Sequence, residues 1–419
     1  MSTYAKTSRR SRLPVVTALV TAAVCAVSLG VSAGPAPAHG TEGGGRDSSG
    51  AALSQKRLQR EVDRTLREAG YVGISVQVRD GQRRTYAVAG EAEVGTGRRV
   101  SHAADFRAAS VTKTFVSTVV LQLAAEGRLS LDDTVEDRLP GVVAGNGNDG
   151  GRITVRHLLQ HTSGIHNYDF TEDTGETAED FERTRFDHHD PEESVAAAMR
   201  HEPDFEPAEP NDPEPDWSYS NTGYMLAGMI IEKVTGKSWD TEIRDRIVRP
   251  LGLTQTYAPG DDPSLKGPYT HAYQRFPGSA GWTDTSVRNM SWASAAGELI
   301  TGERDLDRFL TALQRGRLLP PLQMAELRKT VPAGAEFQAI FPGLHYGLGV
   351  MRQPLSCGGY RWGHGGDLEG QTVRTAVSEN GQRSVVVNAT GKKADDESLF
   401  AAEKAVQALL DRAICGGER

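Results

Sequence analysis

The sequence of 419 residues has few cysteines, few aromatic side chains and no excess of positive charge. Only 3 residues are cysteine and 6% are aromatic, and 47 basic against 55 acidic residues leave a formal net charge of -8. Proteins that bind nucleic acid normally carry a basic patch or stripe, so this balance argues against that class. The hydrophobic content of 38% is that of a globular protein long enough to bury a sizeable core.

Long apolar runs are absent too, except near the N-terminus. Residues 13–33 form such a run, behind a basic head and ahead of Ala36-Pro37-Ala38, which fits the small-residue pattern of a cleavage site. This order predicts a signal peptide over 1–38, a flexible linker over 39–52, and a secreted mature protein without a membrane anchor. An uncleaved anchor helix is the alternative, because the run is just long enough to span a bilayer.

The shortage of cysteine narrows the possible disulfides. Cys25 lies inside the predicted signal peptide, which leaves Cys357 and Cys415 in the mature chain. An exported protein reaches an oxidising compartment, so we expect a disulfide between these two residues, with two free thiols as the alternative.

Strand patterns lie near both ends of the mature chain. Residues 73–90 alternate apolar and polar side chains around Asp80-Gly81, which predicts a β-hairpin. Further strands are predicted at 345–353, 360–366 and 372–390, the last segment turning at Asn380-Gly381. Helical patterns cover 53–69 and 398–412.

The simplest assembly of these elements is an α/β fold with one antiparallel sheet flanked by helices. We expect residues 53–125 and 295–419 to build the sheet domain and residues 126–294 to form an inserted, mostly helical domain. An active site would then lie in the cleft between the two.

An acidic, proline-rich segment spans residues 167–217 of the insertion. We interpret it as a solvated, partly disordered loop, and the alternative is an acidic rim that disfavours anionic substrates. His188-His189-Asp190 within it has no further ligand at a metal-binding spacing, so no metal and no organic cofactor are expected.

Three short motifs occur in a telling order. Ser110 precedes Lys113 by three residues at the start of an apolar helical pattern, Tyr219 and Asn221 follow in WSYSNTGY, and GHGG contains His364, Gly365 and Gly366. Each motif has a structural explanation of its own, namely a helix N-cap, a packed tyrosine and a buried histidine. Their joint occurrence favours a catalytic explanation.

The chemistry that fits these motifs is acyl transfer. A serine hydroxyl is a weak nucleophile that needs a base within hydrogen-bond reach, and Lys113 lies one helical turn from Ser110 on the same face. Lys113 and Tyr219 ordinarily titrate near pH 10, so one of them must act with a lowered pKa. Asn221 could hold both Lys113 and a substrate amide, while Gly365 and Gly366 leave room for an extended substrate at a strand edge.

Longer stretches make the chain resemble a known family. Together with LQLAAEGRLSLDDTV, ITVRHLLQHTSGI, YSNTGYMLAGMIIEKVTGKSW and SWASAAGELIT, the motifs are similar to those of the serine DD-peptidase and class C β-lactamase-like family. The resemblance is greatest to its secreted D-alanyl-D-alanine carboxypeptidases. It implies a D-amino-acid peptide of the cell wall as substrate and β-lactams as inhibitors.

The resemblance also implies a role for each residue. They are Ser110 as acylated nucleophile, Lys113 as its partner, Tyr219 as general base and acid, Asn221 as ligand of the acyl-side amide, His364 as third-motif cation or hydrogen-bond donor, the backbone N–H groups of Ser110 and Asp367 as oxyanion hole, and Trp292 as pocket lining.

One position departs from what a carboxypeptidase needs. An ionised Asp367 would repel the terminal carboxylate of such a substrate unless a cation lies between them, and Arg352 is our candidate for that cation. The leading prediction is a secreted D-Ala-D-Ala carboxypeptidase-like hydrolase. The alternatives are a secreted esterase or D-aminopeptidase with the same residues, and a penicillin-binding module without turnover.

Overall fold

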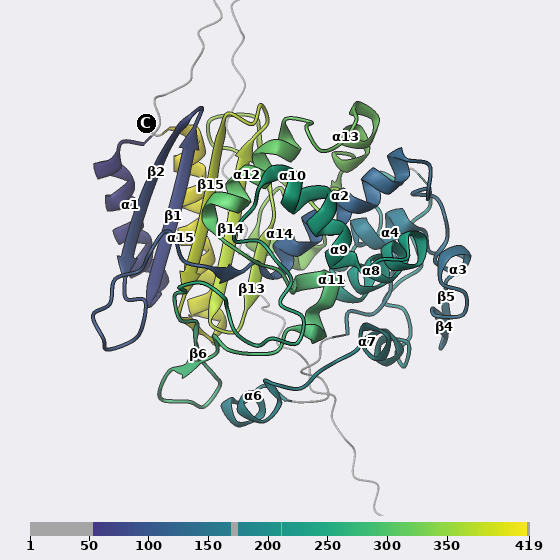
Figure 1. Cartoon of the computed structure of the whole chain (residues 1–419), viewed down its shortest axis with the longest axis horizontal. Coiled ribbons are helices and arrows are strands. Elements are labelled where there is room, and N and C mark those ends of the chain that lie inside the picture. Colours follow the sequence, from purple (N-terminus) through teal and green to yellow (C-terminus); the bar gives the residue numbers. More distant parts are fainter. Residues whose placement is uncertain (1–52, 169–174, 211, 417–419) are drawn as a thin grey trace, which may run out of the picture. The chain divides into compact units, whose positions relative to one another are not determined.

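One antiparallel sheet, built from both ends of the chain, forms the centre of the fold (Figure 1). The computed structural model describes residues 53–168, 175–210 and 212–416, so the predicted signal peptide and linker lie outside the described residues. The strand order is β2-β1-β15-β14-β12-β11-β10-β9, and β13 also pairs with β14. These strands are β1 (Gly73–Asp80), β2 (Arg83–Gly90), β9 (Val331–Pro332), β10 (His345–Tyr346), β11 (Met351–Pro354), β12 (Tyr360–Gly363), β13 (Gly365–Leu368), β14 (Gln371–Ser378) and β15 (Arg383–Thr390).

The two predicted hairpins are confirmed and lie side by side. β1 pairs with β2 through a turn at Gly81, and β14 pairs with β15 through a turn at Gly381. Both glycines have φ near +60°, a conformation that side chains other than glycine adopt with strain. The central pairing joins the chain ends, because Gly73 of β1 lies opposite Thr390 of β15.

Helices cover both faces of this sheet. α1 and α15 lie on one face and α2 and α12 on the other (Figure 1). β15 shows why, since Val385 and Val387 pack into the core under α1 and α15 whereas Val386 packs into the core that contains Phe115 of α2 and Phe309 of α12. The period of two along a strand thus supplies an apolar surface to each layer.

The helices other than α1, α2, α8, α12 and α15 are short. Their bounds are α1 (Gln55–Ala69), α2 (Thr112–Ala125), α3 (Val135–Arg138), α4 (Val155–Gln160), α6 (Ala178–Thr184), α7 (Pro191–Ala198), α8 (Asn221–Thr235), α9 (Trp239–Ile243), α10 (Arg249–Leu251), α11 (Ser294–Gly297), α12 (Glu303–Gln314), α13 (Pro321–Leu327), α14 (Ala335–Ile340) and α15 (Asp396–Cys415), with single turns η1 (Ala109–Val111), η2 (Arg244–Val248) and η3 (Ser291–Ala293). Short strand pairs complete the fold, formed by β3 (Phe106–Arg107), β4 (Ala144–Gly145), β5 (Asn148–Asp149), β6 (Tyr273–Arg275), β7 (Thr283–Asp284), β8 (Ile300–Thr301) and β16 (Lys392–Lys393).

The apolar core continues from the sheet into the helical part of the chain. Val386 of β15, Phe115 of α2, Tyr224 of α8 and Val155 of α4 belong to one cluster of buried side chains. The predicted domain boundary at residue 126 therefore stays a prediction. Among the described residues, no helix is long and apolar enough to cross a membrane.

Several predicted elements differ in detail. Residues 345–353 form two strands instead of one, because the chain turns at Gly349 with φ 73°. Residues 360–366 are interrupted at His364, which separates β12 from β13. The acidic segment is not simply a disordered loop, since its described part contains α6 and α7.

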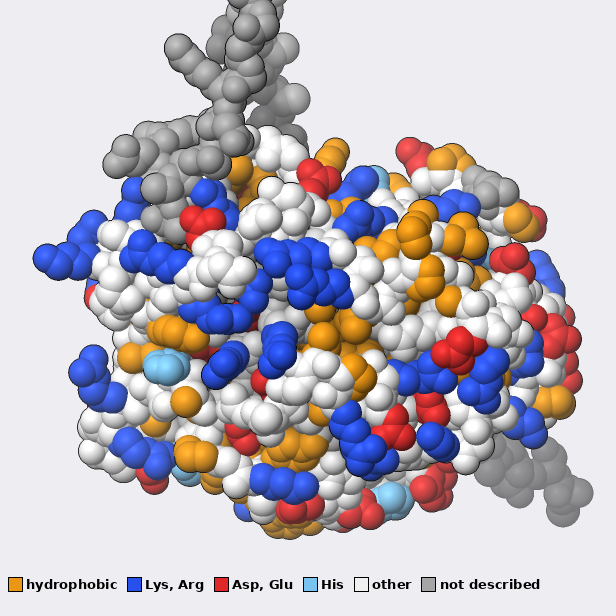
Figure 2. Space-filling model, turned by 45° about the horizontal axis from the view of Figure 1, so that its top comes forward, with side chains coloured by type: hydrophobic (Ala, Val, Ile, Leu, Met, Phe, Trp, Pro, Cys, Tyr) orange, Lys and Arg blue, Asp and Glu red, His pale blue; other side chains and the backbone are white. Residues whose placement is uncertain are grey.

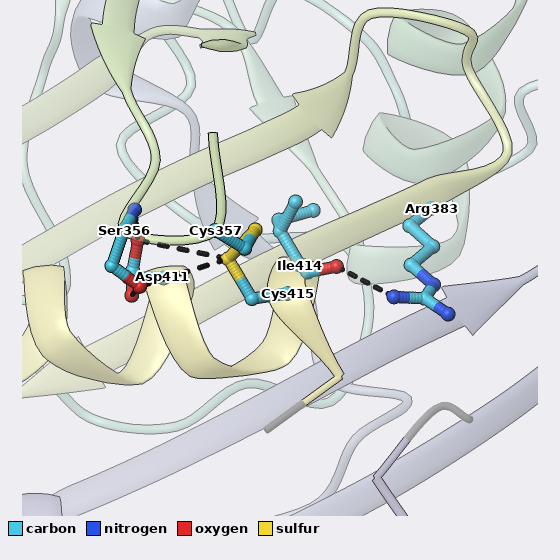
Figure 3. The surroundings of a disulfide bond; sticks show 6 residues. All are labelled: Ser356, Cys357, Arg383, Asp411, Ile414 and Cys415. Atoms are coloured by element: carbon cyan, nitrogen blue, oxygen red, sulfur yellow. Dashed lines mark hydrogen bonds between the residues drawn. A yellow bond between two sulfur atoms is a disulfide. The ribbon is translucent and has the colours of Figure 1, made fainter. Parts of the chain in front are cut away.

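The predicted disulfide is confirmed. Cys357, in the connection between β11 and β12, is bonded to Cys415 at the end of α15 (Figure 3). Next to it, the Ser356 hydroxyl donates to Asp411 Oδ2 at 2.6 Å, which fastens the same loop to the same helix a second time.

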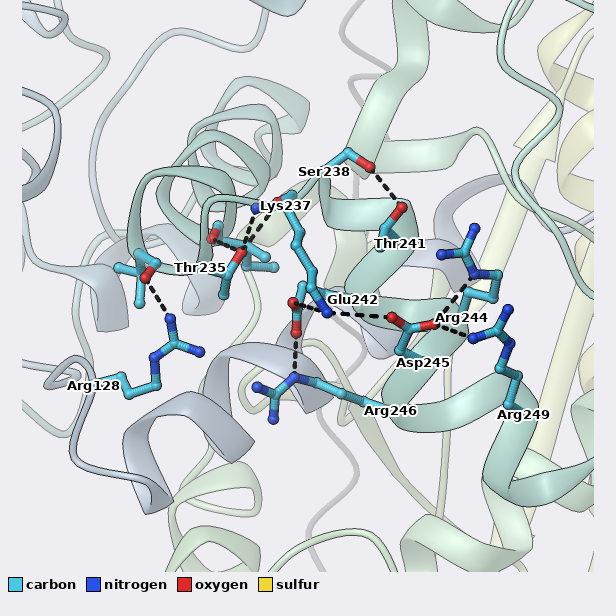
Figure 4. A network of polar contacts seen from close by, with 12 residues as sticks. Arg128, Thr235, Lys237, Ser238, Thr241, Glu242, Arg244, Asp245, Arg246 and Arg249 are labelled. Carbon is cyan, nitrogen blue, oxygen red and sulfur yellow. Dashed lines mark hydrogen bonds and ion pairs between the residues drawn. The ribbon is translucent and has the colours of Figure 1, made fainter.

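Ion pairs fasten the helical part in a similar way. Around the start of α9, Lys237 lies 3.4 Å from Asp245, and Arg249 donates to the same carboxylate at 2.9 Å (Figure 4). Arg246 pairs with Glu242 and, at 2.5 Å, with Glu126 just after α2. On the face shown in Figure 2, Lys and Arg side chains lie among Asp and Glu side chains.

Candidate active site

Ser110 lies in a tight turn that ends against strand β13. The turn η1 leads into α2, and the residue before the serine, Ala109, has a φ of 48°. Such a conformation costs about 1–3 kcal/mol in a residue other than glycine and is often found at functional sites. The N-cap position of α2 belongs to Val111 and has no side-chain hydrogen bond, so Ser110 does not serve as the cap.

Lys113 is completely buried beside Ser110. Its Nζ lies 3.1 Å from Ser110 Oγ, 2.7 Å from Asn221 Oδ1 and 2.7 Å from the carbonyl oxygen of Ala296. Burial lowers the pKa of Lys113 well below its ordinary value. A neutral amine has two N–H donors for the amide and carbonyl oxygens, and its lone pair is then directed at the Ser110 hydroxyl. In that protonation state Lys113 is placed to accept the Ser110 proton.

Tyr219 is placed for the opposite role. Its hydroxyl interacts with the Ser110 side chain, and its ring lies 4.9 Å from Lys113 Nζ and 4.3 Å from the ring of His161. Burial raises the pKa of Tyr219 above its ordinary value, so the phenol keeps its proton. The predicted role of Tyr219 as general base and acid stays a prediction, and a phenol that keeps its proton beside Ser110 is placed to donate it.

His364, predicted as the third-motif cation or hydrogen-bond donor, is placed in the structure as a neutral donor within the protein. Its side chain is 2% exposed, and burial lowers its pKa to about 3. Nδ1 lies 2.5 Å from the Gly365 carbonyl and therefore carries the proton, while Nε2 accepts from the Tyr346 hydroxyl at 2.8 Å. Both ring nitrogens are used within the protein. His364 thus orients the start of β13.

The two glycines of the third motif make room for the protein itself. A Cβ on Gly366 would lie 2.5 Å from the Ala108 carbonyl oxygen and 3.1 Å from the Ser110 nitrogen. A Cβ on Gly365 would lie 3.2 Å from the side chain of Arg374. The sequence predicts that these positions leave room for an extended substrate, but in the structure their first effect is to let β13 approach the nucleophile and Arg374.

Asp367 follows these glycines and is held by two cations. Arg374 Nη1 lies 2.8 Å from Oδ2, and Lys392 Nζ lies 3.0 Å from Oδ1. Burial opposes ionisation, but Arg374 and Lys392 hold the pKa of Asp367 well below its usual range. Asp367 is therefore a carboxylate at neutral pH.

Arg352 is not the cation beside Asp367. It lies on β11, opposite Trp362 of β12, with its guanidinium carbon 4.5 Å from the centre of the Tyr360 ring. β11 pairs with β12, whereas Asp367 lies on β13, beyond the interruption at His364. The prediction that Arg352 is the cation beside Asp367 is therefore wrong, because it depended on a strand pairing register that the sequence does not specify.

A small pocket of about 50 Å³ opens beside the nucleophile. Trp292 lines it, as predicted, together with Ser110, Asn221 and Asp367. Its other walls are Ala109, Tyr168, Met225, Ala293, Ala296, Gly297 and Leu368. Asp367 is the one charged side chain among these lining residues, and the described residues contain no group of three His, Cys, Asp or Glu side chains that could hold a metal ion.

Sequence reasoning missed several residues of this site. Arg374 and Lys392 fix the charge of Asp367, and the Ala296 carbonyl binds Lys113. Arg374 carried one usable signal, since it is a charged residue in the middle of an otherwise uncharged strand pattern. A backbone carbonyl has no such signal in a sequence.

Known proteins similar to this chain share its fold and parts of its sequence. Residues 58–409 match the family model described as Beta-lactamase. Penicillin-binding protein 4 of Amycolatopsis lactamdurans is 37% identical over 162 residues, which cover 39% of this chain and 38% of that protein. The match to this curated relative thus spans about two fifths of its length.

Two solved structures are similar over nearly their whole length. A D-stereospecific amidohydrolase from Streptomyces sp. is 40% identical with a TM-score of 0.73, covering 84% of this chain and 98% of that chain. A D-amino acid amidase from Ochrobactrum anthropi SV3 is 27% identical with a TM-score of 0.68, covering 85% of this chain and 97% of that chain.

Proposed function

This chain is a serine hydrolase of the β-lactamase family, and we propose that it cleaves the amide or ester bond formed by the carboxyl group of a D-amino acid. This activity corresponds to the D-aminopeptidase and esterase alternative of the sequence analysis, and it now takes precedence over the carboxypeptidase. The likeness to a protein described as a D-stereospecific amidohydrolase and to one described as a D-amino acid amidase supports this order. From the N-terminal segment we also propose that the enzyme acts outside the cell.

The charge of the pocket is the observation that carries the proposal. Among the described residues that line it, Asp367 is the only charged one, and the cations beside it, Arg374 and Lys392, are already paired with that carboxylate. A substrate with a carboxylate next to the scissile bond would meet a negative charge and no unpaired cation among the lining residues. A neutral amide, an ester or a substrate ammonium group would not be repelled.

The walls of the pocket indicate the kind of acyl group. Tyr168, Met225, Trp292 and Leu368 offer apolar surface beside Ser110. Burying an apolar side chain there removes its surface from water, which favours binding by about 25 cal/mol for each Å². We propose an apolar D-amino acid as the acyl part of the substrate.

The proton route follows from the site geometry. Ser110 Oγ attacks the carbonyl carbon while its proton moves to neutral Lys113 Nζ. The backbone N–H groups of Ser110 and Asp367 would stabilise the oxyanion, in keeping with the close approach of β13 to Ser110. Tyr219 donates a proton to the leaving amine or alkoxide, and Lys113 returns its proton to Tyr219. Water then hydrolyses the acyl-serine by the same groups.

The test compares four substrates with one acyl residue. They are D-leucine amide, L-leucine amide, D-leucine methyl ester and D-leucyl-D-leucine with a free carboxylate. We expect kcat/KM for the D-amide to exceed that for the L-amide and for the dipeptide by at least about a hundredfold, since each difference removes about 3 kcal/mol of transition-state binding. Ser110→Ala should remove all turnover.

The charge argument has its own variant. Asp367→Asn removes the negative charge from the pocket and leaves Lys392 without this carboxylate, while Arg374 stays paired with Glu403. We therefore expect kcat/KM for the dipeptide relative to the amide to rise by about tenfold. Faster turnover of an acetylated D-Ala-D-Ala peptide than of any amide or ester by the unaltered enzyme would instead establish the carboxypeptidase.

A further inference from the structure

A buried arginine lies directly beneath the active-site strand. Arg374 of β14 is 7% exposed, and its Nη1 donates to the Gly366 carbonyl at 3.1 Å and lies 2.8 Å from Asp367 Oδ2. One guanidinium therefore contacts the backbone of one residue of β13 and the side chain of the next. Gly365, opposite Arg374 in the strand register, leaves the space that this side chain occupies.

The guanidinium is fixed from the other side by helix α15. Arg374 Nε donates to both carboxylate oxygens of Glu403, at 3.0 and 3.1 Å, and Nη2 donates to Oε2 at 2.5 Å. Glu403 is itself 8% exposed and accepts from Gln407 at 2.5 Å. A two-pronged contact between planar groups fixes orientation as well as distance.

The same face of α15 makes further contacts with the rest of the protein at intervals of four residues. Glu403, Gln407, Asp411 and Cys415 are spaced one helical turn apart and form what we call the α15 ladder. In the same order, these four side chains contact Arg374, Arg361, Ser356 and Cys357. The helix that fixes Arg374 is thereby fixed along its own length, ending at the disulfide (Figure 3).

We propose that Arg374, held by Glu403, is a positioning residue that sets the distance between β13 and Ser110. The tolerance at that point is small, because a single added carbon on Gly366 would already lie 2.5 Å from the Ala108 carbonyl oxygen. Displacement of a reacting geometry by about 1 Å can lower a rate about a hundredfold. The inference rests on the acyl-serine chemistry of the proposed function and is independent of the choice between amide, ester and peptide.

The variant Arg374→Gln tests this role, and Arg79→Gln is the matched control. Arg79 of β1 is also an arginine of the sheet paired with a buried acid of a covering helix, Asp307 of α12, at 3.2 Å, but it contacts no residue of β13. The assay uses D-leucine methyl ester, with the active fraction of each preparation titrated by a fluorophosphonate that labels Ser110. Per active site, we expect Arg374→Gln to lower kcat ten- to a hundredfold with KM changed less than threefold, and Arg79→Gln to leave both within threefold.

Two further variants cover a failure to fold. Arg374→Lys keeps a cation beside Asp367 but cannot contact Gly366 and Glu403 together. Glu403→Gln keeps the shape of the side chain that holds Arg374 but removes its charge. Both should lower kcat per active site, by about tenfold and threefold. Equal kcat in the Arg374 and Arg79 variants, or an Arg374→Lys variant that is less stable yet fully active, would overturn the inference. Absence of Ser110 labelling and of turnover in the unaltered enzyme would instead refute the proposed function.

Discussion

Removal of the Cys357–Cys415 disulfide should destabilise the protein by an amount that follows from its loop. The bond joins residues 58 positions apart, and constraining a loop of that length in the unfolded chain corresponds to about 4 kcal/mol at 25 °C. For a chain of this size the same change lowers Tm by about 5 °C. Activity at 25 °C should persist, because Cys415 lies about 18 Å along α15 from the Arg374–Glu403 contact.

The assay is urea unfolding followed by tryptophan fluorescence, with the double variant Cys357→Ala, Cys415→Ala beside the unaltered protein. A second perturbation, the unaltered protein unfolded and refolded under reductant, separates the cross-link from the packing of the side chains. Both should lower the free energy of unfolding equally. A decrease in the free energy of unfolding below about 1 kcal/mol in either case would refute the argument from loop length. A lower kcat without the disulfide would refute the expectation that the Arg374–Glu403 contact does not depend on the bond at Cys415.

Three other perturbations have defined outcomes. Because burial lowers the pKa of Lys113 well below 10.5, we expect kcat/KM to rise with pH and level off before that value, and Lys113→Arg to lose about a thousandfold; a maximum near pH 5 with a fall above it would contradict the base assignment. Gly366→Ala should lower kcat about a hundredfold at unchanged fold by circular dichroism, since its Cβ would lie 2.5 Å from the Ala108 carbonyl oxygen, and full activity would disprove that contact. Burial raises the pKa of Glu303 from 4.5 to about 8, so the unfolded chain loses this proton at lower pH than the folded one and the free energy of unfolding falls as pH rises between those values. Glu303→Gln should therefore be more stable than the unaltered protein at pH 8 but not at pH 4. Identical pH dependence of urea unfolding in the two proteins would exclude the effect.

The parts of the fold that local patterns specify were predictable. Both hairpins follow from alternation around a glycine turn, and the helices at 55–69 and 396–415 from apolar periodicity. Short strands were less predictable. The turn at Gly349 interrupts a run that reads as one strand, because the constraint comes from packing against distant residues such as Ser117, whose Oγ would lie 2.2 Å from a Cβ there.

The identity of the site residues was predictable, and their protonation was not. Ser110, Lys113, Tyr219, Asn221 and Trp292 are brought together as the motifs and the resemblance implied. Which group holds a proton depends on burial, and burial depends on the whole fold. From the sequence we could say only that Lys113 or Tyr219 must act with a lowered pKa, and the resemblance implied Tyr219 as base and acid. In the structure burial lowers the pKa of Lys113 and raises that of Tyr219.

Charge pairs between residues far apart in the chain could not be predicted from the sequence. Asp367 needed a cation, and the sequence contains 47 basic residues to choose from. The register of β13 against β14 selects Arg374, and the parallel pairing of β16 with β6 accompanies the placement of Lys392. Neither register can be read from spacing along the chain.

The sheet is complete only when β15, its last strand along the chain, has formed, because β15 pairs with both β1 and β14. Ser110, Lys113 and Tyr219 are all present in the first 219 residues, but β13, which borders Ser110, is held by β14, and β14 by β15. A shortened chain that ends before residue 383 would keep the nucleophile, its base and its acid and still lack the sheet that supports β13. Pairings between distant residues form slowly, so the appearance of activity during refolding should mark the completion of the sheet rather than the formation of α2.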